Sequence, residues 1–275
     1  MNKITCDLCP RFCSLSENKV GFCNGRKAQM GKIIPINYGK ILSMSLDPIE
    51  KKPIQFYKNN SMILSVGTFG CNMNCQFCQN YEIARAKESD YPTRKILPEQ
   101  LINIAIDNKR LGNIGIAFTY NEPLIGYEYI LDVAKLSEKE DLDIVIVSNG
   151  QINEKYLKEL IPYVAAWNID LKAFSEENYK KLGGDFKTTL RSIEMISLKS
   201  HLEITTLVVP GISDDLELFK KQVEFIGNLD ENIPLHLTRY IPRYKYTLPP
   251  TSIELLNEMK EIAKKHLKNV VLRNI

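Results

Sequence analysis

The sequence predicts an α/β protein: a partial (β/α)6 barrel of the TIM type that follows a small cysteine-rich segment. After residue 60, apolar strand-like runs alternate six times with amphipathic stretches, as in βα units around a parallel sheet. Residues 1–60 lack this rhythm and hold four of the seven cysteines. We therefore expect a metal-binding segment and linker at 1–60 and the barrel at 61–275.

The six predicted barrel strands are short, mostly apolar runs. They are Ile63–Val66, Gly115–Thr119, Asp143–Val147, Ala166–Asp170, Leu202–Val208 and Leu235–Tyr240. The amphipathic stretches between them predict helices near Pro98–Leu111, Gly126–Lys139, Glu154–Leu160, Asp185–Leu198 and Asp214–Asn228. A last helix is expected behind a capping box, Thr251-x-x-Glu254, and Val270–Arg273 would add an edge strand.

Two features are expected within the amino-terminal segment. Lys32–Tyr38 and Lys40–Leu46 predict a β-hairpin. The proline-bounded stretch Asp47–Pro53 predicts an irregular linker that leads to the first barrel strand. The boundary between the two parts is therefore placed near residue 60.

Composition limits the classes of partner. A hydrophobic fraction of 44% and a charged fraction of 25% are typical of a soluble globular protein. A net charge of +3 is too small to favour nucleic acid or an anionic membrane. No signal peptide or spanning segment is visible, so the cysteines predict metal ligands in the reducing cytoplasm rather than disulfides. Arg239–Tyr246, which interleaves basic and aromatic residues, is interpreted as a loop over the barrel mouth or a solvated face.

The most informative motif is a set of three cysteines, Cys71, Cys75 and Cys78, shortly after the first barrel strand. Their C-x3-C-x2-C spacing brings together soft thiolates, which select iron–sulfur clusters, zinc or Cu(I). A closed structural site takes four ligands, and no fourth Cys or His lies nearby in the sequence. A 4Fe–4S cluster on three cysteines keeps one iron open, which predicts a reactive centre.

This spacing, with Phe77 directly before the last cysteine, resembles the cluster motif of radical S-adenosylmethionine (SAM) enzymes. In that family the open iron is chelated by the amino and carboxylate groups of SAM. The backbone at the aromatic position lies near the adenine. The resemblance therefore implies a 4Fe–4S cluster and SAM as cofactors, with Phe77 among the SAM contacts.

Polar motifs stand at the carboxyl ends of the second and third strands, where barrel enzymes place their chemistry. Glu122 matches the acid of a Gly-Gly-Glu-Pro-like motif whose backbone and carboxylate bind the SAM ammonium. Asn121 departs from the glycines of that motif, and its position in the motif predicts that it is also a SAM contact. Ser148 and Asn149 are small polar residues suited to the ribose or carboxylate of SAM. The alternatives are a helix-terminal acid for Glu122 and an ordinary turn after the third strand.

The later strands carry further resemblances to activating enzymes of glycyl-radical enzymes. Asp170 and Lys172 lie on one face of the fourth strand and match an Asp-x-Lys pattern of the SAM site. The turn Val209–Gly211 resembles their Val-Pro-Gly motif, and His236 matches a His that contacts SAM. An internal salt bridge and a structural histidine are the alternatives. His201 and His266 are interpreted as surface residues.

A second set of cysteines occupies the amino-terminal segment with C-x2-C-x3-C-x9-C spacing. Its members are Cys6, Cys9, Cys13 and Cys23. Four ligands in a short segment without an evident core predict a closed metal site that supplies folding energy. Zinc and an auxiliary 4Fe–4S cluster both fit, since ligand type does not separate them. Reduced thiols without a metal are the third alternative.

Together these motifs resemble radical SAM proteins related to pyruvate formate-lyase activating enzyme, and most closely the AmmeMemoRadiSam group. That group carries the Cys-Pro-Arg-x-Cys start, Asp-Pro-Ile-Glu-Lys-Lys-Pro, Cys-Gln-Asn and Thr-Tyr-Asn-Glu-Pro, all present here. The resemblance spans nearly the whole chain. It implies reductive cleavage of SAM to a 5′-deoxyadenosyl radical, with flavodoxin or ferredoxin as the reductant under anaerobic conditions.

The leading hypothesis for the substrate is a backbone glycine of a glycyl-radical enzyme, based on the Asp-x-Lys and Val-Pro-Gly resemblances. Radical modification of a small molecule, RNA or another protein is the second hypothesis. The third is a non-catalytic scaffold in which both cysteine sets carry structural zinc.

Overall fold

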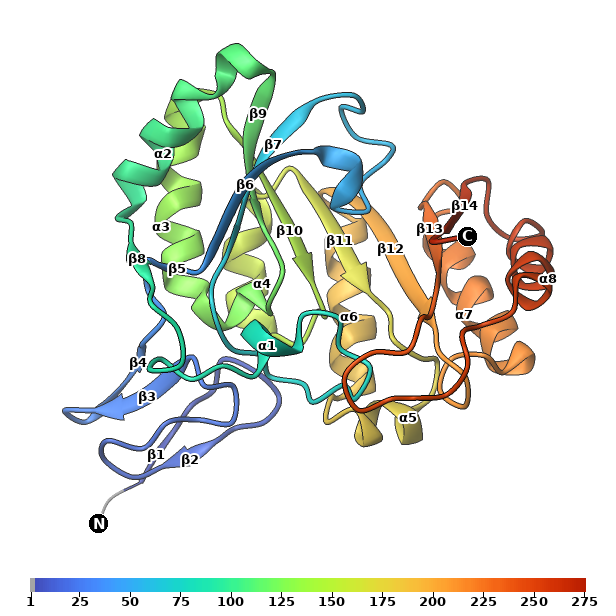
Figure 1. The fold of residues 1–275 in the computed structure, drawn as a ribbon, viewed down its shortest axis with the longest axis horizontal. Helices are drawn as coiled ribbons and strands as arrows, with labels where there is room; N and C mark the ends of the chain where they lie inside the picture. Colours follow the sequence, from blue (N-terminus) through green and yellow to red (C-terminus); the bar gives the residue numbers. More distant parts are fainter. Residues whose placement is uncertain (1–2) are drawn as a thin grey trace.

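A curved eight-stranded sheet forms the centre of the computed structural model, which describes residues 3–275 (Figure 1). Seven neighbouring strands run parallel, and β6 pairs antiparallel with β7 at one edge. In spatial order the strands are β6 (Ser43–Pro48), β7 (Met62–Gly67), β9 (Asn113–Phe118), β10 (Asp143–Ser148), β11 (Ala166–Asp170), β12 (His201–Val208), β13 (Leu235–Arg239) and β14 (Val270–Arg273).

Helices connect successive parallel strands and pack on the sheet. α2 contacts β9, α3 contacts β10, α6 contacts β12, and α8 contacts β13 and β14. The helices are α1 (Tyr81–Ala84), α2 (Pro98–Asp107), α3 (Tyr127–Ser137), α4 (Glu154–Leu160), α5 (Glu176–Lys181), α6 (Phe186–Ser197), α7 (Leu216–Leu229) and α8 (Ile253–Ala263). This βα alternation confirms the predicted α/β fold and its partial TIM-like barrel.

Small antiparallel pairs form the amino-terminal end of the chain, drawn in blue at the lower left of Figure 1. β1 (Ile4–Thr5) pairs with β2 (Ser14–Leu15), and β3 (Arg26–Gln29) pairs with β4 (Lys32–Pro35). β5 (Lys40–Ile41) pairs with β8 (Arg94–Lys95), which lies far along the sequence.

The hairpin predicted from Lys32–Tyr38 and Lys40–Leu46 is therefore wrong. Residues 43–48 instead form β6, which makes a six-residue ladder with β7. The exposed edge of a parallel sheet offers unpaired backbone groups, and this longer ladder satisfies more of them than a short hairpin would. β6 thus joins the barrel although it lies within residues 1–60. The segment read as a linker contains the end of β6 and a 3-10 turn, Ile49–Lys51.

The predicted barrel strands and main helices occur close to their expected positions, but the expected cap of α8 is wrong. Ser252, not Thr251, caps this helix and accepts a hydrogen bond from the Leu255 amide. The Thr251 hydroxyl donates to the Val208 carbonyl at the end of β12. Serine and threonine are both good N-cap residues. The hydrogen bond between Thr251 and Val208 leaves Ser252 as the cap.

A buried carboxylate organises the amino-terminal end of the parallel strands. Glu203, the third residue of β12, lies 2.6 Å from His236 Nε2 and 2.9 Å from His201 Nε2. It also accepts hydrogen bonds from the amides of Gln55 and Phe56. Burial alone would raise the pKa of Glu203, but these hydrogen bonds lower it to about 2. His201, expected at the surface, is half-buried by this contact.

Arg273 of β14 completes this network. Its Nε donates to His236 Nδ1 at 2.9 Å, and its Nη1 donates to the Glu50 carbonyl at 3.0 Å. Burial lowers the pKa of His236, so the neutral ring accepts from Arg273 at Nδ1 and donates to Glu203 from Nε2. The network ties the segment after β6 to the last strand and closes this end of the barrel.

We expect Glu203→Ala to destabilise the fold by about 3 kcal/mol or more at pH 7, because several buried donors lose their acceptor. The folded-state pKa lies below the usual 4.5, so this contribution is present above pH 4.5 and is lost as the pH falls toward 2. Urea unfolding at pH 7 and pH 3 measures both effects. Exposed Glu224→Ala is the control, with an expected change within about 0.5 kcal/mol. An equal cost for the two variants at pH 7 would contradict this role of Glu203.

Candidate active site

The loop between β7 and α1 carries Cys71, Cys75 and Cys78 at the carboxyl end of the sheet (Figure 1). This loop has no regular structure of its own, and other segments hold its backbone. The Gly70 amide donates to Ile83, and the Asn74 amide donates to Leu182. The positions of the thiols therefore depend on hydrogen bonds to α1, which follows the loop, and to the end of α5, which is distant in the sequence.

The three thiols share one environment. Burial raises the pKa of each thiol, to about 11 for Cys75. The Lys172 ammonium acts in the opposite direction on Cys75 and Cys78. Cys71 Sγ accepts hydrogen bonds from the Met73 amide at 3.4 Å and from Asn149 Nδ2 at 3.8 Å. Donors of this kind stabilise thiolates that ligate metals.

Asp170 and Lys172 lie beside these thiols, as their spacing on one strand face predicts. Lys172 Nζ is 2.9 Å from Asp170 Oδ2. Burial alone would lower the pKa of Lys172, but Asp170 and Cys75 raise it, so the ammonium stays charged. The internal salt bridge, which was the alternative to a role in the SAM site, is therefore present, and the same pair also lies next to the cysteines.

Glu122 links the ends of β9 and β10. It is 2% exposed, and its carboxylate accepts hydrogen bonds from the Ser148 hydroxyl (2.8 Å), the Leu124 amide (3.0 Å) and the Asn149 amide (2.8 Å). Burial raises the pKa of Glu122 to about 7, against the opposite effect of these three donors. The Glu122 carboxylate thus binds two other predicted SAM contacts, Ser148 and Asn149.

The Asn121 side chain hydrogen-bonds the backbone at the start of the cysteine loop. Its Nδ2 donates to the Gly70 carbonyl at 3.0 Å, and its Oδ1 accepts from the Thr68 amide at 3.1 Å. Both ends of this amide are therefore engaged with the chain. We predicted Asn121 as a SAM contact, and the structure gives it a role in shaping the loop.

The segment after β13 crosses the carboxyl ends of the strands, in red at the lower edge of Figure 1. Its Lys245 amide donates to the Gln76 carbonyl in the cysteine loop. The Tyr246 hydroxyl donates to the Pro210 carbonyl at 2.7 Å, and its ring meets the buried Phe77 ring edge-on at 6.2 Å. This strap joins the cysteine loop to the Val-Pro-Gly turn. Sequence reasoning placed a loop here but missed Tyr246 as its anchor.

The structure separates His236 from the other predicted site residues. His236 is the second residue of β13, so it lies near the amino-terminal end of the strand, in the Glu203 network. Both of its ring nitrogens are engaged there. The cysteines stand at the opposite, carboxyl end, and the expected contact of His236 with SAM is not supported by this placement.

The amino-terminal cysteines also come together. Cys6, Cys9 and Cys23 are buried and Cys13 is half-buried. Burial raises the pKa of Cys9 to about 11, and the nearby Cys23, Cys6 and Cys13 add to the shift. Within residues 3–275, no three His, Cys, Asp or Glu side chains surround a point as the ligands of one metal ion do. A cubane cluster does not require this, because its ligands bind separate irons.

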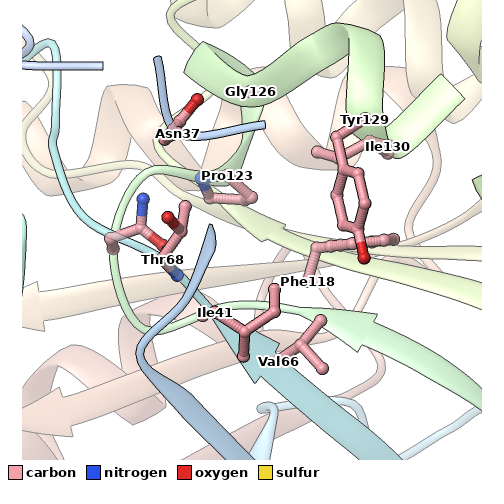
Figure 2. Close-up of a pocket in the computed structure, with 11 residues that line it drawn as sticks. Asn37, Ile41, Val66, Thr68, Phe118, Pro123, Gly126, Tyr129 and Ile130 are labelled. Carbon is pink, nitrogen blue, oxygen red and sulfur yellow. Dashed lines mark hydrogen bonds between the residues drawn. The ribbon is translucent and has the colours of Figure 1, made fainter. Parts of the chain in front are cut away.

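A small pocket that is partly open to solvent lies beside the ends of β7 and β9 (Figure 2). Ile41, Val66, Phe118 and Ile130 give it a mostly apolar wall. It includes none of the cysteines, so it is separate from the thiol site. No helix among residues 3–275 is long and apolar enough to cross a membrane.

The model of the radical SAM superfamily matches residues 65–222, more than half of the chain. The chain belongs to the radical SAM superfamily. Radical SAM enzymes use a 4Fe–4S cluster and SAM, and this chain is accordingly an enzyme that cleaves SAM by radical chemistry. The three neighbouring thiols, with amide donors to Cys71, fit the cluster of this superfamily.

Relatives of known sequence extend the match beyond this core. An uncharacterized protein of Methanocaldococcus jannaschii is 35% identical over 282 residues, which span 100% of this chain and 82% of that protein. A second protein of that archaeon, provisionally named a glycyl-radical enzyme activating enzyme, is 31% identical over 74% of this chain and 77% of its own length. Pyruvate formate-lyase-activating enzyme of Clostridium pasteurianum is 26% identical over 68% of this chain and 77% of its own length. The chain is thus similar to pyruvate formate-lyase activating enzymes.

Solved structures share the fold at low identity. A domain of the pyruvate-formate lyase-activating enzyme of Bacteroides vulgatus has a TM-score of 0.51 at 17% identity, covering 57% of this chain and 98% of that one. SuiB of Streptococcus suis, solved with SAM, has a TM-score of 0.59 at 15% identity, covering 82% of this chain and 54% of that one. These likenesses establish the barrel architecture.

We expect Ser148→Ala to destabilise the protein by about 1.5–3 kcal/mol at pH 8.5 and by less at pH 5. Above its pKa of about 7, Glu122 is ionised and buried. In the wild type the Ser148 hydroxyl donates a hydrogen bond to this charge, and the variant lacks that donor. The pKa of Glu122 rises further in the variant, so the cost appears as the pH increases through 7. Urea unfolding at both pH values measures it. Ser137→Ala, which removes a buried hydroxyl bonded only to the Ala134 carbonyl, is the control and should show a cost independent of pH. The same pH-independent cost for Ser148→Ala would refute the pairing with ionised Glu122.

Proposed function

We propose that this radical SAM enzyme is an activating enzyme that abstracts hydrogen from a backbone glycine of a glycyl-radical enzyme. The observation that carries the proposal is the similarity to proteins named as activating enzymes, which extends over 68–82% of the chain. The Asp-x-Lys pair beside the cysteines and the Val-Pro-Gly turn at the end of β12 support it.

The residues at the carboxyl end of the sheet have distinct roles in this proposal. Cys71, Cys75 and Cys78 hold the cluster. When bound, the cluster and SAM supply a one-electron cleavage that yields methionine and a 5′-deoxyadenosyl radical. Asp170 and Lys172 present a charge pair to SAM, while Glu122 fixes the strand ends that frame the site.

The strap over the barrel mouth suits a protein substrate. Ile241 and Leu248 of this segment are 53% and 45% exposed, and Tyr244 stacks on Tyr81 of α1 at 4.5 Å. Exposed apolar side chains beside an active site are typical of a surface that binds another protein. The strap also limits access of water to the thiols beneath it.

We expect anaerobically reconstituted protein to form 5′-deoxyadenosine from SAM and dithionite, and Cys75→Ala to abolish this product. Loss of one of three cysteines removes an iron ligand, so both the cluster and the cleavage depend on it. Chromatography of the acid-quenched reaction measures the product. The exposed-surface variant Lys139→Ala is the control and should retain the wild-type yield. Product formation at the wild-type level by Cys75→Ala would exclude this cysteine from the cluster.

The substrate is tested by electron paramagnetic resonance after incubation with SAM, a reductant and each candidate glycyl-radical enzyme of the source organism. A glycyl radical should appear on one partner, and deuterium on that glycine should be recovered in 5′-deoxyadenosine. No glycyl radical on any partner, with SAM cleavage intact, would reject the activating-enzyme proposal. Label transfer from an RNA, a small molecule or another protein would identify the other class of substrate.

A further inference from the structure

The amino-terminal cysteine set lies directly against the loop of the catalytic cysteines. The Cys71 amide donates to the Cys23 carbonyl at 3.1 Å. Gly70 makes this approach possible, since it has a φ of 97° and any Cβ there would clash with the Cys23 carbonyl oxygen. A single hydrogen bond therefore connects the backbone of one cysteine set to that of the other.

A second connection consists of two arginines on one aromatic ring. The guanidiniums of Arg11 and Arg85 lie 3.5 Å and 4.9 Å from the centroid of the Phe22 ring. Arg11 Nε donates to the Asn72 carbonyl at 2.7 Å, and Arg85 donates to the Cys71 carbonyl at 3.3 Å. The residue before Cys23 is thus linked through both arginines to the backbone of the catalytic loop.

The amino-terminal thiols form one group of four possible ligands. Burial raises the pKa of Cys9, and Cys23, Cys6 and Cys13 lie close enough to add to the shift. Four cysteine thiolates are the usual ligands of a 4Fe–4S cluster, with one thiolate on each iron. The direct backbone contact with the catalytic loop favours such a redox-active centre over zinc, which has no redox chemistry.

The surface of this segment is suited to an anionic protein. Residues 3–35 contain six basic and two acidic side chains, while the rest of the chain is nearly balanced. Lys3, Lys19 and Lys32 are exposed, and Asp7 is paired with Lys155. Phe12, next to Cys13, is 53% exposed. A basic surface with an apolar contact point steers an acidic partner to this site.

We propose that Cys6, Cys9, Cys13 and Cys23 bind a second 4Fe–4S cluster that relays electrons from an acidic one-electron carrier to the catalytic cluster. In each transfer the carrier is oxidised by one electron, the amino-terminal cluster changes from the 2+ to the 1+ state, and it returns to 2+ as the catalytic cluster is reduced from 2+ to 1+. No proton moves and no bond forms. This relay goes beyond the proposed function, since it is independent of the substrate.

Metal content tests the cluster. In a variant with Cys71→Ala, Cys75→Ala and Cys78→Ala, we expect about four irons and four sulfides per chain after anaerobic reconstitution. The dithionite-reduced variant should show the resonance signal of a 4Fe–4S cluster that does not respond to SAM. Wild-type protein should hold about eight irons, with two reduction steps in a potentiometric titration. One zinc and no iron in the triple variant, with a single reduction step in the wild type, would overturn the assignment.

The relay is tested in a Cys9→Ala, Cys13→Ala variant by comparing two donors. Reduced ferredoxin and photoreduced deazaflavin, a small donor, are each used to reduce the catalytic cluster. The ratio of the ferredoxin rate to the deazaflavin rate should fall by about tenfold or more relative to the wild type. A purely structural role of these cysteines would lower both rates alike and leave the ratio unchanged, which would overturn the relay.

A charge variant keeps the relay testable if the cysteine variant does not fold. Lys19→Glu with Lys32→Glu leaves all seven cysteines in place, so iron content should stay at the wild-type value. The same rate ratio should fall, and its dependence on salt should weaken, because steering of an acidic carrier is electrostatic. An unchanged ratio would mean that the carrier does not bind at this basic surface, and it would overturn the relay. These rates are measured without a substrate, so their failure is distinct from failure of the glycyl-radical proposal.

Discussion

The loop that carries Cys71, Cys75 and Cys78 depends on hydrogen-bond partners from other parts of the chain. It contains no helix or strand, so its backbone groups are satisfied by carbonyls and amides of distant segments. Arg85, Asn121 and the Cys23 carbonyl supply several of these bonds. Three thiols in a fixed geometry are therefore a property of the assembled fold, and the amino-terminal segment and the barrel contribute to them jointly.

Electrostatics impose a second requirement on the same region. Burial disfavours the ionised form of each of the three thiols and of Glu122, yet metal ligation needs thiolates. The charged Lys172 and the amide donors to Cys71 offset part of this cost. A bound cationic iron centre would offset more. Thiolates at this buried site are thus stabilised by Lys172, by the amide donors and by a bound metal centre, in keeping with the superfamily to which the chain belongs.

The barrel strands, the main helices and the order of the motifs could be predicted from the sequence, because strand and helix periodicity and cysteine spacing are local properties. The sequence was not sufficient where a partner distant in the chain decided the outcome. Residues 43–48 have the composition of a hairpin strand, and only the free edge of β7 makes them β6. Thr251 and Ser252 are equally good caps, and the Val208 carbonyl selects between them. Asn121 has the polarity of a ligand contact, but both ends of its amide are used by the cysteine loop.

His236 shows how position along a strand outweighs residue type. A buried histidine on a barrel strand has the chemistry of a cofactor contact, and the motif match favoured that role. In a parallel strand, however, the first and last residues lie at opposite ends of the barrel, because each residue advances about 3.3 Å. His236 is second in β13 and meets Glu203, which is third in β12, at the amino-terminal end. The residues that reach the thiols occur at the ends of their strands or just beyond them, as with Asp170, Lys172 and Asn149. The polar networks at the two ends of the barrel therefore have different roles. The Glu203 network closes the amino-terminal end, and the residues at the carboxyl end surround the thiols.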